Sequence, residues 1–327
     1  MSTIQSTGIA IVLFLQGLGE WLTGPMEFLS FLGVAEFYLL LMPALYWCVD
    51  TGLAVRLGLI LLPSTALSNS LKIFLHQPRP YWITQQVQAL ATHGDFALPS
   101  GHAQNAVTYW GLLAASQRRR WAWAAALALM FLIGLSRVYL AVHFPTDVIL
   151  GWLVGALLLW AFLRWEKPAG DWIRCRSARQ LVLISLLVSL ALLGLTGVAI
   201  ASLADWQMPT SWYENAVAGT GEPPDPLAPL DTLTATGALF GLTSGLIWMS
   251  QAGGFRSDGP AWKRVMRFLV GIVGVAILWL GLKQVFTQES NWLGFSLRFV
   301  RYALIGLWIS AGAPALFLRV KLAESRD

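Results

Sequence analysis

Charged residues are scarce in this chain, and cysteine is almost absent. Of 327 residues only 12% are Asp, Glu, Lys or Arg, and only two are Cys. Two cysteines are too few for a thiolate metal site. The net charge is +5, but the basic residues do not form a soluble basic domain. Nucleic acid is therefore not an expected partner.

Apolar residues make up 56% of the chain and gather in long runs. Runs of about 17 to 25 residues can each cross a bilayer core as a helix, and they are too uniformly apolar for barrel strands. The expected spans are 33–49, 55–75, 101–117, 121–137, 147–164, 181–203, 234–252, 266–286 and 297–319. The sequence therefore predicts an all-α polytopic integral membrane bundle, with about six helices in its first half and about four more after residue 170.

The segment 7–22 is ambiguous, because its apolar residues suit either a short span or a helix lying in the membrane interface. We favour the interfacial interpretation. The segment lacks a basic start and a convincing cleavage site, so we do not expect a removed signal peptide.

Basic residues fall on alternate connections between the expected spans. One side of the membrane receives 16 of the 22, namely Arg56, Arg118, Arg119, Arg120, Arg164, Lys167, Arg174, Arg176, Arg179, Arg256, Lys263, Arg264, Arg267, Arg319, Lys321 and Arg326. The excess of basic residues marks this side as cytoplasmic. Cys48 and Cys175 fall at cytoplasmic ends, so no disulfide is expected. The default location is a bacterial inner membrane.

Three short blocks on the opposite side carry the chemistry: KIFLHQPRP at 72–80, PSGH at 99–102 and SRVYLAVHFPTD at 136–147. The first two are separated by 18 residues, which form an outer loop, and the last two by 33. The second gap fits one outgoing and one returning helix. All three blocks are therefore expected at one outward membrane face.

The PSGH block is predicted to start a helix with Ser100 as its N-cap. The free N–H groups of Gly101 and His102 then suit an anion such as phosphate, and the glycine permits close backbone approach. His143 and Asp147 share a helix face if the helix has already begun at His143. Asp147 can then hold one imidazole nitrogen and leave the other directed at phosphorus.

Lys72, Arg79 and Arg137 supply cationic donors for the oxygens of a phosphoryl group, where charge stabilisation is most of the catalytic task. Only Asp147 is an obvious partner for these cations in the sequence. Such a group is costly near a membrane without an anion to bind, so a phosphate site is expected. His143 is the candidate nucleophile, and His102 the candidate acid and then base.

In order, type and spacing, the three blocks resemble the signature of the type 2 phosphatidic acid phosphatase superfamily, over roughly the first half of the chain. The resemblance implies a nucleophile at His143, its orienting carboxylate at Asp147 and an acid and base at His102. It implies a phosphate clamp made by Lys72, Arg79, Ser100, Gly101, Ser136 and Arg137. No metal or other cofactor is needed in that scheme.

Other residues have more ordinary interpretations. His76 is expected to fill a gap in its block, His93 to lie in a solvated loop, and Tyr81 and Trp82 to anchor the chain in the membrane interface.

Beyond residue 170 the sequence is less informative. Gly237, Gly241 and Gly245 predict close helix packing, while Arg298 and Arg301 are expected to meet lipid head groups.

We therefore expect a phosphatase core over 1–170 and an additional transmembrane region of unknown role over 171–327. The predicted activity is hydrolysis of a terminal phosphate from a lipid phosphate or polyprenyl diphosphate at the outer face. A lipid phosphotransferase using the same intermediate and a lipid-binding or lipid-transport protein remain the alternatives. Membrane lipids are the expected surroundings, and the sequence leaves the oligomeric state open.

Overall fold

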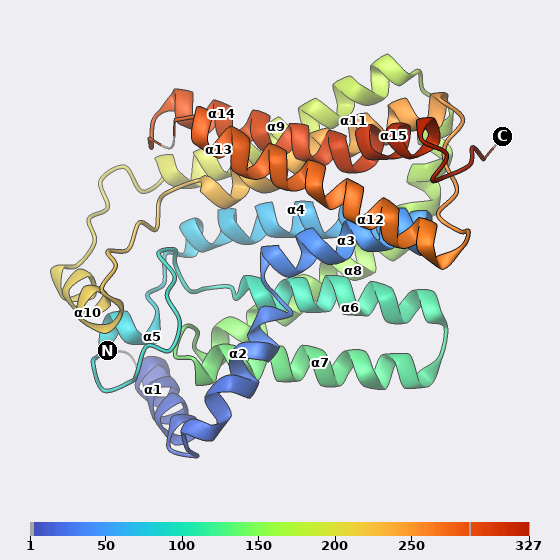
Figure 1. The fold of residues 1–327 in the computed structure, drawn as a ribbon. Helices are drawn as coiled ribbons and strands as arrows, with labels where there is room; N and C mark the ends of the chain where they lie inside the picture. The colour runs from blue at the N-terminus through green and yellow to red at the C-terminus, as the bar shows by residue number, and fades with distance from the viewer. Residues whose placement is uncertain (1–2, 288, 327) are drawn as a thin grey trace. The chain divides into compact units, whose positions relative to one another are not determined.

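The computed structural model describes residues 3–287 and 289–326, and every regular element in these residues is a helix. The helices are α1 Thr3–Gln16, α2 Thr23–Phe31, α3 Ala35–Cys48, α4 Thr51–Leu75, α5 Pro80–Ile83, α6 Gly101–Gln117, α7 Arg120–Tyr139, α8 Pro145–Arg174, α9 Ala178–Ala201, α10 Thr210–Thr220, α11 Leu230–Gln251, α12 Ala261–Ala276, α13 Leu282–Val285, α14 Trp292–Leu307 and α15 Ala313–Arg319 (Figure 1). The predicted all-α membrane fold is confirmed.

Each of the nine predicted spans falls on a helix. Seven helical segments are long and apolar enough to cross a membrane: Thr51–Ile83, Arg120–Tyr139, Pro145–Arg174, Ala178–Ala201, Leu230–Gln251, Ala261–Val285 and Trp292–Arg319. The helices at the other two predicted spans, α3 and α6, are shorter, with 14 and 17 residues. The last two spans each contain one π-helical turn, at Ile277–Gly281 and Trp308–Gly312.

The ambiguous N-terminal segment is bent. Thr3–Gln16 and Glu20–Phe31 together are apolar enough for a span but meet at an angle of 90°. Gly19 stands at the bend with a φ of 118°, a backbone conformation that favours glycine. The pair is therefore a broken span or a re-entrant segment, and the interfacial placement of 7–22 stays a prediction.

The chain forms two compact units, each assembled from three stretches. Unit 1 takes the residues up to Phe37, Leu67–Trp160 and Thr196–Ala228; unit 2 takes Tyr38–Ala66, Ala161–Leu195 and the residues from Pro229 onward. All three motif blocks lie in unit 1. The two units do not coincide with the expected division at residue 170, because each unit contains residues from both sides of it. The phosphatase core over 1–170 therefore stays a prediction about where the chemistry lies.

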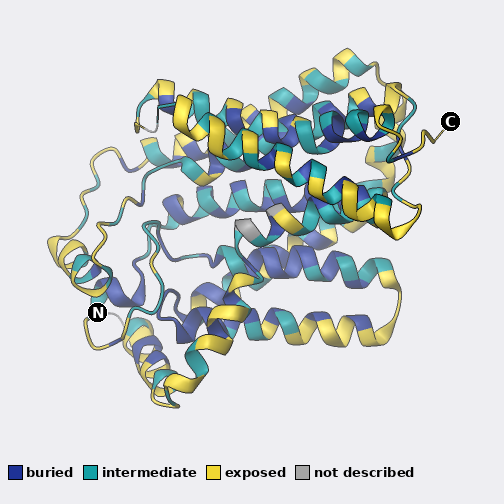
Figure 2. Cartoon of the chain, in the orientation of Figure 1, coloured by how far each residue is buried: buried dark blue, intermediate teal, exposed yellow. Residues whose placement is uncertain are grey.

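Close helix contacts in unit 1 place the beginning of α6. A Cβ on Gly151 would lie 2.5 Å from the carbonyl oxygen of Ser100, and one on Gly155 would lie 2.6 Å from that of Gln104. Helix α8 therefore approaches α6 backbone to backbone, which small residues allow. Helix α7 runs alongside α6 (Figure 1), and α6 is buried over most of its length (Figure 2).

Unit 2 confirms the predicted glycine packing. A Cβ on Gly237 or Gly241 would overlap the carbonyl oxygen of Phe299 or Ala303, so α11 lies directly on α14. A Cβ on Gly245 would likewise overlap the hydroxyl of Ser310.

The arginines of α14 do not simply face lipid. Arg301 is only 3% exposed, so the head-group expectation is wrong for this residue. Arg298 donates from Nε to the carbonyl oxygen of Leu230 and to Thr234 Oγ1, both at 3.0 Å. Both arginines are held by packing within unit 2.

Candidate active site

The three sequence blocks meet in unit 1, as their spacing predicted. Arg79 of the first block donates from a terminal nitrogen to the carbonyl oxygen of Val142, in the third block, at 2.7 Å. The backbone N–H of Ser100, in the second block, donates to the carbonyl oxygen of Asp147 at 2.9 Å. A Cβ on Gly101 would lie 3.9 Å from Lys72 Nζ. Each block thus lies directly beside the other two.

Lys72 and Arg79 come from the end of α4 and the start of α5, and both point at one carboxylate. Asp95 Oδ2 accepts from Lys72 Nζ, and Asp95 Oδ1 lies 2.5 Å from a terminal nitrogen of Arg79. Arg79 Nε also donates to the carbonyl oxygen of Asp95 at 2.7 Å. The Lys72 side chain is 11% exposed and that of Arg79 is fully buried, so a counter-ion is required.

Arg137, near the end of α7, is 1% exposed and is held by two neutral partners. One terminal nitrogen donates to Ser30 Oγ, on α2, and the other lies 2.6 Å from His93 Nε2. Among the described residues its Nε has no partner. This guanidinium therefore keeps one buried donor, and its charge is not matched by a carboxylate in these contacts.

His143 has a carboxylate behind it. Its Nδ1 lies 3.5 Å from Asp147 Oδ2, and both side chains are almost fully buried. The same Asp147 oxygen accepts the backbone N–H of Phe144 at 2.8 Å. Helix α8 begins only at Pro145, so the premise that the helix has started at His143 is wrong. The pair forms across the helix cap, where the carboxylate is fixed by a backbone donor.

Ser100 caps α6 as predicted. The helix begins at Gly101, and the Ser100 hydroxyl accepts the N–H of Ala103 at 3.4 Å. A Cβ on Gly101 would lie 3.1 Å from the hydroxyl of Ser68, which has no hydrogen-bond partner within 3–287 and 289–326. The glycine therefore keeps open the space between the helix start and a buried free hydroxyl.

His102 occupies the second position of α6. Its Nε2 is buried and has no partner in the described part of the chain. Its ring meets that of His93 edge to face, with centroids 5.9 Å apart. A Cβ on Gly33 would lie only 2.7 Å from His102 Cδ2, so the turn after α2 also packs against this ring. The ring is held in place while one nitrogen remains free for proton transfer.

Ser136 lies at the site but directs its proton elsewhere. Its hydroxyl donates to the carbonyl oxygen of Ile133, in the same helix, at 2.7 Å. With its proton used in this bond, the hydroxyl can only accept further hydrogen bonds, whereas an anion needs a donor. The assignment of Ser136 to the phosphate clamp stays a prediction, whereas Lys72, Arg79, Gly101 and Arg137 are placed where they could serve it.

Lys72, Arg79, Arg137, His102, His143 and Asp147 are together called the cluster. Three titratable groups lie in loops at this cluster. Burial, together with the positive charges of Arg79 and Arg137, holds the pKa of His143 well below its usual range. The same causes lower the pKa of His93. Burial alone would raise the pKa of Asp95, but Lys72 and Arg79 outweigh it and hold that pKa below its usual range. Both histidines are therefore neutral and Asp95 is ionised at neutral pH.

Two residues at the cluster were missed by the sequence reasoning. His93 does not lie in a solvated loop: it touches Arg137 and His102. Asp95 is a further carboxylate partner beyond Asp147, and it was missed because it lies outside the three blocks. A charge within five residues of a helix-starting PSGH was the only signal in the sequence.

Tyr81 and Trp82 do not act as interfacial anchors, so that prediction is wrong. They are 2% and 0% exposed, and the Tyr81 hydroxyl donates to the carbonyl oxygen of His93 at 2.8 Å. They form part of the wall that supports the loop carrying His93 and Asp95.

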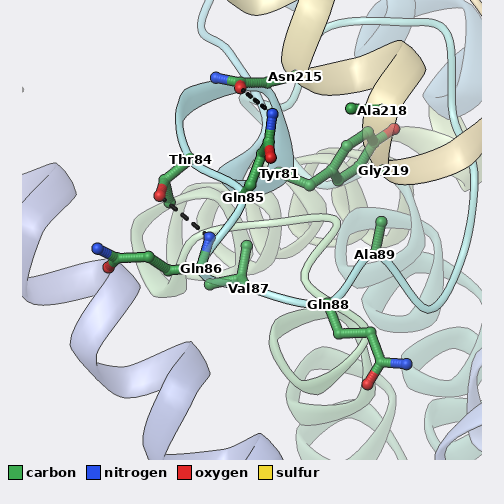
Figure 3. A pocket seen from close by; sticks show the side chains of 10 residues that line it. All are labelled: Tyr81, Thr84, Gln85, Gln86, Val87, Gln88, Ala89, Asn215, Ala218 and Gly219. Carbon is green, nitrogen blue, oxygen red and sulfur yellow. Dashed lines mark hydrogen bonds between the residues drawn. The ribbon is translucent and has the colours of Figure 1, made fainter.

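A pocket of about 330 Å³ lies beside the cluster, between the loop after α5 and helix α10 (Figure 3). Its lining is mostly amide and small side chains: Tyr81, Thr84, Gln85, Gln86, Val87, Gln88, Ala89, Asn215, Ala218 and Gly219. None of the predicted site residues lines it. Within the described residues, no three His, Cys, Asp or Glu side chains are grouped as metal ligands would be.

Comparison with known families is consistent with this geometry. A family model described as the PAP2 superfamily matches residues 53–171, and one described as the transmembrane extension of PAP2 superfamily phosphatases matches residues 233–325. The chain belongs to the PAP2 superfamily. The predicted resemblance and the predicted phosphatase class are confirmed. The late helices, whose role the sequence left open, match an extension already known in PAP2 proteins.

Several known phosphatases are similar to this chain in sequence. Phosphatidylglycerophosphatase B of Bacillus subtilis is 28% identical over 42% of this chain and 72% of its own length. Glucose-6-phosphatase 3 of Bos taurus is 26% identical over 90% of this chain and 87% of its own. An undecaprenyl-diphosphatase of Sulfolobus acidocaldarius is 44% identical over 19% of this chain and 30% of its own.

Two solved structures also resemble the chain. The transmembrane PAP2-type phosphatidylglycerolphosphate phosphatase of Bacillus subtilis is 25% identical, with a TM-score of 0.45 over 51% of this chain and 88% of that one. Aquifex aeolicus LpxE is 26% identical, with a TM-score of 0.43 over 47% and 93%.

Proposed function

We propose that this membrane phosphatase hydrolyses the terminal phosphate of a lipid phosphate or polyprenyl diphosphate, without a metal, through a phosphohistidine on His143. The observation that carries the proposal is the placement of His143 beside three buried cations, with the Asp147 carboxylate 3.5 Å from its Nδ1. A nucleophile, its orienting group and an anion clamp are the parts that phosphoryl transfer requires.

In the first step Nε2 of His143 attacks phosphorus and forms a P–N bond, while the P–O bond to the leaving group breaks. His102 gives its proton to the leaving oxygen, so the lipid departs as a neutral alcohol or as a shorter phosphate. Lys72, Arg79 and Arg137 donate to the non-bridging oxygens, where negative charge concentrates. Asp147 stabilises the positive charge that develops on the imidazole.

In the second step His102, now neutral, accepts a proton from water as the water oxygen attacks phosphorus. The P–N bond breaks, inorganic phosphate leaves, and His143 returns to its neutral form. His102 is then protonated for the next cycle. The free, buried Nε2 of His102 supports this double role, because a ring nitrogen already bonded to the protein could not exchange protons with both partners.

A lipid substrate follows from the surroundings of the site. The first and third motif blocks lie at the ends of helices apolar enough to cross a membrane, so a lipid can reach the site sideways with its head group already at the depth of these blocks. The distribution of basic residues favours the outer face, which in a bacterial inner membrane is the periplasmic one.

A soluble sugar phosphate is the second candidate substrate. It is favoured by the extent of the match to the bovine glucose-6-phosphatase 3, which covers most of both chains. A phosphotransferase would use the same intermediate but pass the phosphoryl group to another alcohol, and a lipid transporter would need no intermediate.

The test is phosphate release by the purified full chain in detergent, with EDTA present. The panel is phosphatidate, phosphatidylglycerol phosphate, polyprenyl diphosphate and glucose 6-phosphate. His143→Ala should abolish release, and His76→Ala is the matched control because His76 contacts Phe74, Phe96 and Trp206 rather than the cations. Loss of substrate only when an acceptor alcohol is added, with phosphorylated acceptor and no free phosphate as the product, would favour the transferase. Equal release by native protein and His143→Ala would overturn the proposal.

A further inference from the structure

The three cations of the clamp are all engaged by one short stretch of the loop between α5 and α6. Asp95 pairs with Lys72 and Arg79, and His93 contacts Arg137. The nitrogens that would bind the oxygens of a phosphoryl group are thus bonded to the protein itself. A bound phosphate and these loop side chains require the same donors.

The carboxylate lies on the accessible side of the cations. The side chain of Asp95 is 30% exposed, whereas those of its partners Lys72 and Arg79 are 11% and 0% exposed. A ligand arriving from outside therefore meets the carboxylate before the buried charges. The pKa of Asp95 lies below its usual range because of these cations, so the group carries a full negative charge at neutral pH.

We propose that Asp95 is a resident counter-anion that occupies the phosphoryl position in the resting enzyme and is displaced when phosphate binds. The inference deepens the proposed function and rests on it for the location of the phosphate. Its consequence is weaker binding of every anion at the clamp, including the inorganic phosphate produced in each cycle. The carboxylate returns to the cations as the product leaves.

The displacement needs only a side-chain rotation, because the backbone of the loop is held independently. Arg79 Nε is bonded to the Asp95 carbonyl oxygen at 2.7 Å rather than to the carboxylate. The N–H of Ala97 donates to the carbonyl oxygen of Gln77 at 2.9 Å, and the carbonyl oxygen of Gly94 accepts the N–H of Asp225 at 3.1 Å. These bonds remain when the carboxylate turns outward, so Arg79 stays oriented for the incoming anion.

The charge balance favours the exchange. Two buried cations without an anion would be strongly destabilising, so the resting site needs the carboxylate. A phosphoryl dianion brings one more negative charge than Asp95, and Arg137 of the same clamp keeps an Nε that has no partner among the described residues. Phosphate therefore replaces the carboxylate with a net electrostatic gain. The gain is reduced because the ion pairs of Asp95 with Lys72 and Arg79 must break each time phosphate binds.

The experiment is calorimetric titration of inorganic phosphate into the purified full chain in detergent. Asp95→Asn and Asp95→Ser remove the charge, with Asp205→Asn as the control, because Asp205 is an exposed carboxyl elsewhere in unit 1. We expect both Asp95 variants to bind phosphate at least about tenfold more tightly, equivalent to about 1.4 kcal/mol. The control should bind as the native chain does.

Two results would overturn the proposal. Weaker phosphate binding in both variants would show that Asp95 positions Lys72 and Arg79 and stays in place. Failure of both variants to fold even when purified with excess phosphate would also overturn it, since phosphate should replace the missing counter-ion. The titration measures binding and not turnover, so an inactive chain is detected separately, in the substrate panel, without affecting this comparison.

Discussion

Replacing Asp147 with Asn removes the negative charge behind His143 and keeps the shape of the side chain. Two unit charges 3.5 Å apart interact by about 5 kcal/mol at an effective dielectric of about 20. This energy is an upper limit for how much Asp147 stabilises the positive charge that develops on the imidazole as phosphorus is attacked. With a tenfold change for each ~1.4 kcal/mol, we expect His143 to react about 100- to 1,000-fold more slowly.

The structure separates this effect from loss of folding. In Asp147→Asn the amide oxygen of the new side chain can still accept the N–H of Phe144, so the start of α8 stays capped. The same amide oxygen then still faces His143 Nδ1, so the ring proton stays on Nδ1 and only the negative charge behind the imidazole is lost. Since Asp147 contacts no substrate in the proposed mechanism, KM should change little.

The assay is rapid-quench measurement of the phosphoenzyme, together with steady-state phosphate release. Asp50→Asn is the matched control, because Asp50 also accepts a backbone N–H at a helix start, that of Leu53 at 2.9 Å, but lies outside the cluster in unit 2. Rates within about threefold of native in Asp147→Asn would refute the assigned role of the carboxylate.

Three further predictions concern packing and pH. Gly101→Ala should weaken inorganic phosphate binding by about tenfold or more in calorimetry, since the new methyl group enters the space beside Ser68 Oγ, 3.1 Å away. Gly241→Ala should lower the free energy of unfolding by about 1–3 kcal/mol because its Cβ would clash with backbone, whereas Gly194→Ala, with open space around it, should have little effect in the same thermal melts. Because the pKa of His143 is depressed, the nucleophile stays neutral as the pH falls. The rate of phosphoenzyme formation, corrected for titration of the substrate, should therefore begin to fall only below about pH 6.5. A fall that begins at or above that pH would contradict the burial of His143.

The motif residues could be found from the sequence because the reaction limits which residue types can serve it. A phosphohistidine site needs a histidine with a nearby carboxylate, cationic donors and a helix start, and these stand at fixed spacings in short blocks. The helical membrane fold was equally accessible, because a bilayer tolerates few alternatives to apolar helices. The cap at Ser100 and the glycine packing of α11 followed from local rules.

Contacts between distant segments could not be found in this way. Asp95, His93 and Ser30 reach the cations only because loops and helices far apart in the chain fold together. The burial of Tyr81 and Arg301 likewise depends on which face of a segment meets protein and which meets lipid.

The amino-acid sequence by itself determined the membrane-helical class, through long apolar runs, and the family, through the resemblance of three short blocks. It also supplied the groups that we propose for catalysis, because these stand within those blocks. Only the tertiary structure decided what those groups touch in the resting protein: that Asp95 neutralises Lys72 and Arg79, and that Arg137 faces neutral partners. The physical reason is that a buried charge is stabilised by whatever lies within a few ångströms of it, and chain separation does not specify that distance.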